Sequence, residues 1–396
     1  MTARIYYTDP FRRTFDASVT RALQHEGRPA AVLDSTAFYP TSGGQPFDVG
    51  RLDDAEVIDV VDMDDDVVHV LSRELAAGSR VHGELDWTRR FDHMQQHTGQ
   101  HVLSAACDRI FDNRTTSFHM GAELSTIDLA REMTGAEIER AVDDANAVVW
   151  EDRPVSIRFV SAEEARTLPL RKEPAREGPL RLIEIADFDL SACGGTHVAR
   201  TGAIGMIVVA GSERVRGGSR ISFACGGRAL RAWRTYRDAV AGSSRVLSVL
   251  PHELAAAVER SQAEARGLRK TIGGLQESLA SYEAARLLET AEVVEGMRVV
   301  VQTIDGWDAA GLKSMAAGIV SAGNTAVALL SSATPAILVV ARSADVSRID
   351  AGKVLRRLVD RFGGKGGGRP ELAQGGGLSG SPADIAAAAR ELLASR

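Results

Sequence analysis

Two pairs of potential metal ligands, each with its members four residues apart, constrain the fold of this chain most strongly. The first pair is His97 and His101, and the second is Cys193 and His197. Four residues are about one helical turn, so the two histidines of the first pair can project from one helix face. Two glycines follow Cys193 and allow a tight turn before His197. If one zinc ion takes all four ligands, the helix and the turn must meet in space.

A histidine pair at helical spacing is by itself more often structural than metal-binding. Here both pairs occur together, so we expect one Zn²⁺ per chain. The ion could be structural with four protein ligands, or one ligand could give way to water or substrate. A metalloprotease is not expected, because the HExxH motif needs a glutamate where this chain has Thr98.

With 396 residues the chain exceeds one ordinary domain, and its pattern predicts an α+β multidomain protein with four successive parts. Residues 1–90 alternate short β-prone runs with turn signals, which is typical of a small β-barrel. Residues 91–226 mix helices and strands and contain both ligand pairs, so they form the zinc-containing core. Residues 227–293 have apolar positions at helical spacing, and residues 294–396 alternate strands and helices as in an α/β domain.

The third part is expected to consist of long helices. Its main interruptions are Pro251 and Gly273-Gly274, so an antiparallel helical hairpin or an oligomerisation segment is predicted. A homodimer could form through this helical linker or through the C-terminal domain.

Composition excludes several classes of protein. Hydrophobic residues make up 44% of the chain and charged residues 25%, as in globular proteins, and no apolar run reaches the roughly 18 residues of a membrane span. Charged residues interrupt the first thirty positions, so no signal peptide is expected. Three cysteines give no disulfide framework, and a thiolate ligand suits a cytoplasmic location. The net charge of −6 argues against nucleic-acid binding by the whole surface, but it allows a local basic patch.

A glycine-rich segment at 363–377 carries Lys365, Arg369 and Gln374 at fixed places among its glycines. A flexible linker would be the simplest interpretation. Because the segment lies between two predicted helices, we expect instead a structured loop whose backbone N–H groups approach phosphate or ribose.

Basic residues are concentrated beside this loop. Seven lysines and arginines, Arg356 and Arg357 among them, lie between 348 and 369 against two aspartates. A solvated helix face is the alternative, but the neighbouring glycine loop favours a phosphate-binding surface.

Three stretches read FDHMQQHTGQHVLSAAC at 91–107, SACGGTHVARTGAIG at 191–205 and RVRGGSRISFACG at 214–226. They closely resemble the editing domain of alanyl-tRNA synthetase and the freestanding alanyl-tRNA editing proteins (AlaX). LDSTAFYPTSGGQPFDVGRL at 33–52 resembles the barrel that precedes this domain, and FGGKGGGRPELAQGGG at 362–377 resembles the terminal domain of the synthetase. The chain has no class II aminoacylation core and no Asp-His-His triplet of the related phosphoesterases, so the long form of AlaX is the closest resemblance.

The resemblance implies a zinc-dependent hydrolase that deacylates mischarged tRNA(Ala), chiefly Ser-tRNA(Ala) and in second place Gly-tRNA(Ala). Residues 91–226 would be the editing domain, and the loop in 294–396 would bind tRNA. An aminoacyl ester needs a polarised carbonyl and an attacking water, and zinc can supply either or orient the substrate.

The resemblance also implies which residues contact the substrate. The family places a threonine after the first zinc motif to bind the serine hydroxyl. Thr115 and Thr116, which we expect in a loop, are the candidates here, with turn or cap chemistry as the alternative. His119 stands where the synthetase typically has a glutamine near the site, so it is a third catalytic candidate, with a packing or surface role as the alternative. Gly43, Gly44 and Gln45 form the family's GGQ loop near the acceptor end, unless they form only a turn.

Two rival functions remain open from the sequence. The first is a non-catalytic tRNA-binding or synthetase-associated protein with a structural zinc. The second is a hydrolase of another ester or phosphodiester, which the missing Asp-His-His triplet disfavours.

Overall fold

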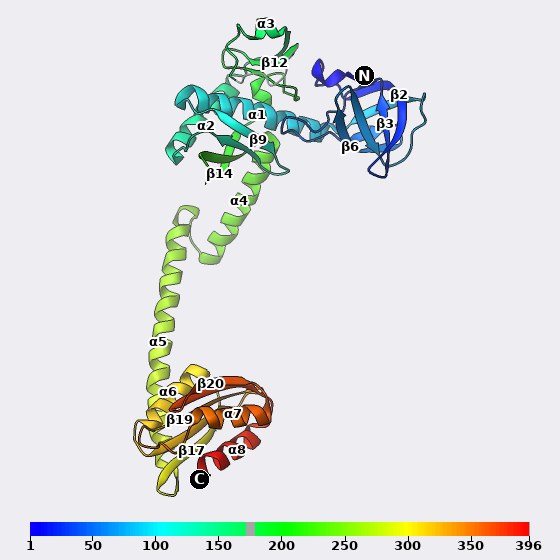
Figure 1. The fold of residues 1–396 in the computed structure, drawn as a ribbon. Helices are drawn as coiled ribbons and strands as arrows, with labels where there is room; N and C mark the ends of the chain where they lie inside the picture. Colours follow the sequence, from blue (N-terminus) through cyan, green and yellow to red (C-terminus); the bar gives the residue numbers. More distant parts are fainter. Residues whose placement is uncertain (172–178, 396) are drawn as a thin grey trace. The chain divides into compact units, whose positions relative to one another are not determined.

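The computed structural model describes residues 1–171 and 179–395. They form two compact units, Met1–Gly242 and Ser243–Arg396 (Figure 1). The described part of the chain is a mixed α+β structure with several sheets, which confirms the predicted fold class at that level. None of its helices is both long and apolar enough to span a membrane.

Six strands near the N-terminus form a closed barrel in the order β2-β3-β7-β6-β5-β8. They are β2 (Thr14–His25), β3 (Arg28–Leu33), β5 (Gly50–Leu52), β6 (Ala55–Met63), β7 (Asp66–Leu71) and β8 (Arg80–Leu85). Side chains alternate between the buried interior and solvent, most regularly in β8, as a closed sheet of this size requires. The loop between β4 (Ser35–Thr36) and β5 carries the GGQ sequence.

Helix α1 (Trp87–Phe111) is the centre of the following α+β region. Asp86 caps its N-terminus by accepting a hydrogen bond from the Arg89 backbone N–H, and Asp112 ends it in a left-handed conformation. Arg90 is completely buried and its guanidinium pairs with buried Asp48 at 2.5 Å, so the GGQ-bearing loop is fixed to the first turn of α1.

Two sheets surround α1. The first has the order β14-β15-β10-β9, and the second is the antiparallel sheet β11-β12-β13. Helix α2 (Gly135–Trp150) packs with α1 against the first sheet, and their buried apolar side chains form one core. The strands are β9 (Thr115–Met120), β10 (Ser125–Leu129), β11 (Val155–Val160), β12 (Leu180–Ile185), β13 (Asp189–Ala192), β14 (Ile207–Val215) and β15 (Gly218–Cys225). The short helix α3 (Ala162–Ala165) follows β11.

The segment with Thr115 and Thr116 was expected to be a loop, and this expectation is wrong, because the two threonines begin β9. A β-bulge opposite Asp128 and Leu129 makes Thr116 an extra residue between the paired Thr115 and Ser117. Strict alternation would turn Thr115 and Phe118 to opposite faces of the strand. The bulge removes that restriction, and both side chains contact α1.

Long helices follow the first sheet. They are α4 (Gly226–Leu247) and α5 (Leu254–Glu289), with the short 3₁₀ turn Pro251–Glu253 before α5. Gly273-Gly274 was expected to interrupt the helix, but α5 continues through both glycines. Each glycine costs about 1 kcal/mol relative to alanine in a helix. Helix-forming residues on both sides, and burial of Ala280, Ala284 and Leu287 near the C-terminal end, offset this cost.

The second unit is a six-stranded sheet covered on both faces. Its strand order is β16-β17-β18-β19-β21-β20. Helices α7 (Ala351–Phe362) and α8 (Pro382–Ala394) pack on one face, and α6 (Ala309–Val320) packs on the other with the end of α5. The strands are β16 (Glu292–Val294), β17 (Met297–Ile304), β18 (Thr325–Ser331), β19 (Ala336–Arg342), β20 (Lys365–Arg369) and β21 (Leu372–Leu378).

The glycine-rich segment was expected to be a loop, and it is instead the hairpin β20–β21 at the edge of this sheet. The prediction was wrong because glycine has a low strand propensity. Here packing requires the glycines: a Cβ at either Gly366 or Gly375 would lie 3.0 Å from a Leu355 methyl group of α7. The absence of side chains therefore lets α7 lie directly against the hairpin.

Candidate metal centre

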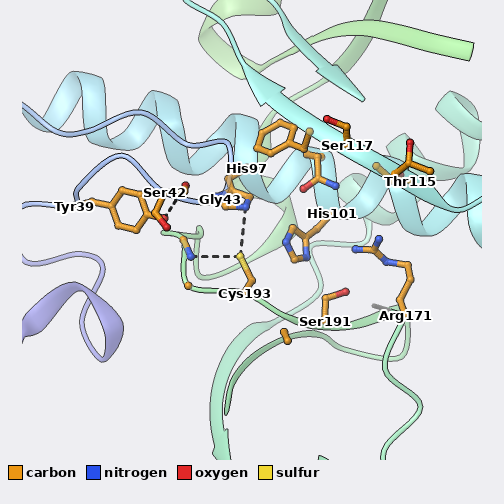
Figure 2. A pocket seen from close by; sticks show the side chains of 16 residues that line it. Tyr39, Ser42, Gly43, His97, His101, Thr115, Ser117, Arg171, Ser191 and Cys193 are labelled. Carbon is orange, nitrogen blue, oxygen red and sulfur yellow. Dashed lines mark hydrogen bonds between the residues drawn. The ribbon is translucent and has the colours of Figure 1, made fainter. Parts of the chain in front are cut away.

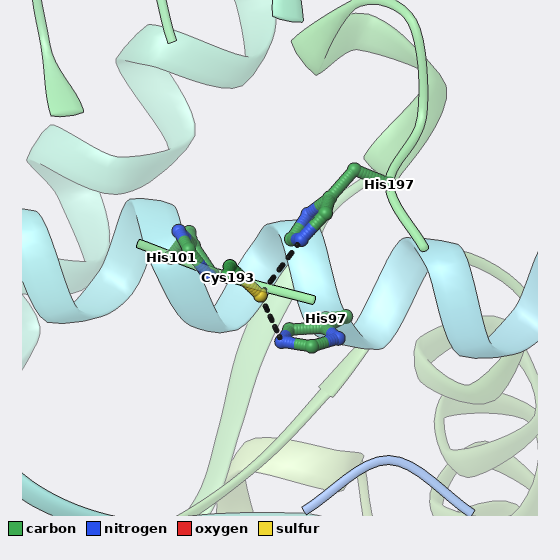
Figure 3. Close-up of side chains that lie close together, drawn as sticks. All are labelled: His97, His101, Cys193 and His197. Carbon is green, nitrogen blue, oxygen red and sulfur yellow. Dashed lines mark hydrogen bonds between the residues drawn. The ribbon is translucent and has the colours of Figure 1, made fainter. Parts of the chain in front are cut away.

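The four predicted ligands converge, although they come from two distant parts of the chain. His97 and His101 project from α1, and Cys193 and His197 follow β13 (Figure 3). Their ligand atoms lie within 4.8 Å of one another. Cys193 Sγ is 3.4 Å from His97 Nε2 and 3.3 Å from His197 Nε2. A tetrahedral zinc site with bonds of about 2.3 Å to sulfur and about 2.1 Å to nitrogen separates such atoms by about 3.6 Å. The cluster is therefore close to the size that a bound metal ion requires.

The hydrogen bonds of Gln45 fix the tautomer of His97. Gln45 Oε1 accepts from the backbone N–H of Thr196 at 3.1 Å, which identifies it as the amide oxygen. The same oxygen lies 2.8 Å from His97 Nδ1, so Nδ1 must carry the proton. His97 Nε2 is then unprotonated and presents its lone pair to the cluster.

The other two histidines have the same tautomer as His97. His101 Nδ1 lies 3.0 Å from Asp189 Oδ2, and a carboxylate can only accept. His197 Nδ1 lies 3.2 Å from Thr98 Oγ1, whose single proton is donated to the Met94 carbonyl. All three Nδ1 atoms therefore donate outward and all three Nε2 atoms are free, as in protein zinc sites with ordered outer-shell partners.

The protonation states also suit metal binding. Burial and the charge of Arg181 lower the pKa of His97 to about 3. Burial, with electrostatic repulsion from His97, His101 and Arg181, holds the pKa of His197 well below its usual value. Burial alone would raise the pKa of Cys193, but a proton shared with His101, the Gly195 N–H and Arg181 together lower it. A metal ion bound to His101 Nε2 would take the place of that proton. Neutral imidazoles and a thiolate are the forms that bind metals.

Asp189 stabilises the site from behind His101. It is buried, and its carboxylate binds both His101 and Arg171, whose Nε lies 2.6 Å from Asp189 Oδ1. Burial would raise the pKa of this carboxyl, but the two hydrogen bonds hold it far below its usual value. A permanent carboxylate at this position keeps His101 oriented and compensates the positive charge of Arg171.

The ligand cluster opens into a cavity of about 180 Å³. Thr115 and Arg171 lie on one side of His101, and Tyr39 and Ser42 lie beyond His97 (Figure 2). The lining residues are Tyr39, Ser42, Gly43, His97, Gln100, His101, Thr115–Phe118, Arg171 and Ser191–Gly195. The cavity is thus small and mostly polar, with three of the four potential metal ligands, His97, His101 and Cys193, in its wall.

The structure brings some predicted substrate residues into this cavity and leaves others out. Thr115 and Thr116 both line it, but the Thr116 hydroxyl donates to the Asp128 carbonyl at 3.1 Å. His119 is exposed on β9, opposite Thr126, and is not among the lining residues, so its assignment as a catalytic residue has no support from the geometry.

Some residues of the GGQ loop line the cavity, and others are buried in the interior. Gly43 lines the cavity, and Gly44 packs so closely that a Cβ would lie 2.5 Å from the Phe118 carbonyl oxygen. Gln45 was assigned to tRNA contact from the sequence. It is 0% exposed, so the structure places it against His97 instead.

The remaining predicted tRNA-binding residues lie in the second unit. Lys365 and Gln374 line a shallow cleft over the hairpin together with Ala309 and Ile337. Arg369 is exposed on β20, and Arg356 and Arg357 are exposed on α7, on the opposite face of the sheet from α6.

Sequence reasoning missed most of the residues that support the ligands. Asp189 and Arg171 lie in no motif, because their partners lie far away along the chain or carry no local signature. Thr98 and Thr196 lie inside the two ligand motifs, but the spacing does not reveal their hydrogen bonds. The GGTH sequence could have drawn attention to Thr196, whose hydroxyl accepts from Gln45 Nε2 at 2.9 Å.

Comparison with known families gives two matches. Residues 180–221 match the family described as "Threonyl and Alanyl tRNA synthetase second additional domain", and residues 296–395 match the "DHHA1 domain". Each match covers one part of the chain.

Comparison with curated proteins extends over nearly the whole chain. Alanyl-tRNA editing protein AlaX-L of Pyrococcus horikoshii is 31% identical over 388 residues, covering 95% of this chain and 94% of that protein. Alanine–tRNA ligase of Pyrococcus furiosus is 34% identical over 391 residues, covering 94% of this chain and 42% of the ligase. The chain therefore spans less than half the length of the ligase. Among solved structures, the C-Ala domain of Aquifex aeolicus alanyl-tRNA synthetase is 23% identical and covers 26% of this chain with a TM-score of 0.25, which is too low to bear on the fold.

Proposed function

The chain belongs to the family of freestanding alanyl-tRNA editing proteins. We propose that it hydrolyses the ester bond of mischarged tRNA(Ala), chiefly of Ser-tRNA(Ala) and in second place of Gly-tRNA(Ala). The observation that carries this proposal is that four metal-type ligands lie together and three of them line a polar cavity of about 180 Å³. A cavity of this size suits a small aminoacyl group. The ligase activity of the synthetases is not part of the proposal.

The metal that best fits the donor set is zinc. One thiolate and three imidazoles form a ligand set that zinc prefers, whereas magnesium and calcium take oxygen ligands. When bound, the ion would supply a Lewis acid that polarises the ester carbonyl, lowers the pKa of a water or orients the aminoacyl group.

The chain's own residues would orient the reaction. Gln45, Asp189 and Thr98 hold the three imidazoles in one tautomer and one orientation. Thr115 lies in the cavity wall where a serine side chain could reach it, and Gly43 leaves space for the acceptor end. The polar wall favours a substrate with a hydroxyl over one with a methyl group, since a buried polar group left unpaired costs free energy.

Residues of the second unit would bind parts of the tRNA other than the aminoacyl ester. We propose that the exposed basic residues of α7 and the hairpin β20–β21 contact phosphates, because cationic side chains beside exposed backbone suit an anionic polymer.

The helical linker supports a proposed homodimer. Helix α5 has large exposed apolar side chains at alternating spacings of four and three residues, which is the pattern of a coiled-coil seam. They are Leu268 (56% exposed), Ile272 (54%), Leu275 (65%), Leu279 (51%) and Tyr282 (78%).

The test of the proposed function is a deacylation assay with Ser-tRNA(Ala), Gly-tRNA(Ala) and Ala-tRNA(Ala), with and without a chelator. The proposal expects rapid release of serine, slower release of glycine, little release of alanine, and loss of activity on zinc removal that added zinc restores. The alternative is a non-catalytic tRNA-binding protein with a structural zinc. It would bind all three tRNAs and release no amino acid from any of them.

A further inference from the structure

Three polar side chains form a hydrogen-bonded chain at one wall of the cavity. Gln100 Nε2 donates to Ser104 Oγ at 2.8 Å, and Thr115 Oγ1 lies 2.7 Å from the same oxygen. Gln100 is 6% exposed and Ser104 is 0% exposed, whereas Thr115 is half-buried. Gln100 and Thr115 line the cavity, and Ser104 links them from behind.

The hydrogen bonds of Ser104 determine how the Thr115 hydroxyl is held. An amide nitrogen can only donate, so one lone pair of Ser104 Oγ is taken by Gln100. The hydroxyls of Ser104 and Thr115 lie 2.7 Å apart and share one hydrogen bond, which either of them can donate. In both directions the Thr115 oxygen keeps a hydrogen-bonding position for a group in the cavity.

The backbone supports the same arrangement. Gln100 and Ser104 are one helical turn apart on α1 and therefore share a face. Thr115 faces that helix because of the bulge at Thr116, so its side chain is held toward Ser104. The three hydrogen-bonded side chains thus come from α1 and β9, two elements that pack in one core.

We infer that Gln100 and Ser104 are positioning residues that set amino-acid specificity by holding the Thr115 hydroxyl as a hydrogen-bond partner for the substrate, an inference that rests on the proposed function. A serine hydroxyl can pair with it. An alanine methyl cannot, and it would remove water from the unpaired oxygen. Glycine leaves room for a water that can donate, so the order of preference becomes serine, glycine, alanine.

The experiment uses the full-length chain and compares kcat/KM for Ser-tRNA(Ala), Gly-tRNA(Ala) and Ala-tRNA(Ala). The variants are Ser104→Ala, Gln100→Leu, Thr115→Val, Thr115→Ser and the double variant Ser104→Ala/Thr115→Val. The ratio of kcat/KM for two substrates on one preparation does not depend on the active fraction, so partial misfolding does not distort it. Zinc content and the midpoint of thermal unfolding are measured in parallel.

Ser104→Ala and Gln100→Leu should each lower the serine-to-alanine ratio about tenfold, which is the usual effect of one hydrogen bond. Zinc should remain at one ion per chain. Thr115→Ser should keep the ratio, because its hydroxyl still pairs with Ser104. In the Thr115→Val background, Ser104→Ala should change the ratio no further, since it acts through Thr115. Thr126→Val, on the neighbouring strand and outside the cavity lining, is the matched control and should leave the ratio unchanged.

Two results separate this inference from the function on which it rests. An active wild-type protein whose ratio is unchanged by Ser104→Ala and Gln100→Leu, or whose double variant shows additive losses, overturns the inference alone. A wild-type protein with no activity on any of the three tRNAs overturns the proposed function and the inference with it.

Discussion

Gln45 and His97 lie on different elements of the first unit, yet Gln45 Oε1 accepts a hydrogen bond from His97 Nδ1 over 2.8 Å. Gln45 is fixed in turn by the backbone and hydroxyl of Thr196, next to the ligand His197. One amide therefore connects the GGQ loop, α1 and the turn after β13. This contact makes the loop part of the candidate metal centre.

Replacing Gln45 with leucine should weaken zinc binding, because His97 would lose the partner that fixes its orientation. Outer-shell substitutions of this kind typically cost 10–100-fold in metal affinity. Competition with a chromogenic chelator measures the affinity. Gln24→Leu, an exposed glutamine of the barrel, is the control. Equal zinc affinity in Gln45→Leu and the wild type would contradict the assigned role.

Removing the thiolate should have a larger effect. Cys193→Ala deletes one of the four ligands, so zinc should fall below one ion per chain, and deacylation should decrease by more than the 10–100-fold typical of an outer-shell change. Metal analysis after gel filtration and the Ser-tRNA(Ala) assay test this. Cys107→Ala is the matched control, because Cys107 is buried on α1 but is not part of the cluster. Full zinc occupancy of Cys193→Ala would show that the metal does not bind here.

The sequence predicted those features that depend on local pattern. The shared helix of His97 and His101 follows from their spacing, and the joint occurrence of both ligand pairs predicted that they converge. It did not predict contacts such as His101–Asp189, because a single carboxylate far along the chain has no local signature. The hairpin β20–β21 was missed for another reason: packing against Leu355 outweighs the low strand propensity of its glycines.

The barrel contains a histidine that should make stability depend on pH. His69 is fully buried, and burial lowers its pKa to about 4, only partly opposed by its hydrogen bond to the Ala31 carbonyl. Since the pKa is about 6.5 in the unfolded chain, the unfolded state binds the extra proton between these values. Stability should therefore be full above about pH 6.5 and fall by about 1.4 kcal/mol per pH unit toward pH 4.

Thermal unfolding midpoints of the wild type and His69→Gln across this pH range test the prediction. Zinc loss at low pH affects both proteins equally, so the difference between their pH dependences isolates His69. The variant should be less stable at neutral pH and should lose less stability on acidification. Parallel curves for the two proteins would mean that His69 does not remain neutral in the fold.

The exposed seam of α5 predicts a dimer that one substitution should dissociate. Leu275 is 65% exposed at the middle of the seam, and a lysine there would bring two charges together in a coiled coil. Leu275→Lys should sediment as a monomer at concentrations where the wild type is a dimer. Gln276→Lys changes the charge beside the seam and should remain dimeric. A monomeric wild type would contradict the proposed dimer.

The basic surface of the second unit should contribute to tRNA binding rather than to ester hydrolysis. Arg356, Arg357 and Lys365 are exposed, and each phosphate contact that is lost should reduce the slope of log K against log salt by about 1. Arg356→Ala, Arg357→Ala and Lys365→Ala should therefore bind tRNA(Ala) more weakly at low salt and show a flatter salt dependence. Lys313→Ala, exposed on α6, is the control.

Hydrolysis of a minimal aminoacylated acceptor stem should be the same in all of these proteins, because the cavity and its ligands lie in the other unit. Normal tRNA binding together with lost hydrolysis of the minimal substrate would mean that these side chains belong to the active site, and that the proposed division between catalysis and tRNA binding is wrong.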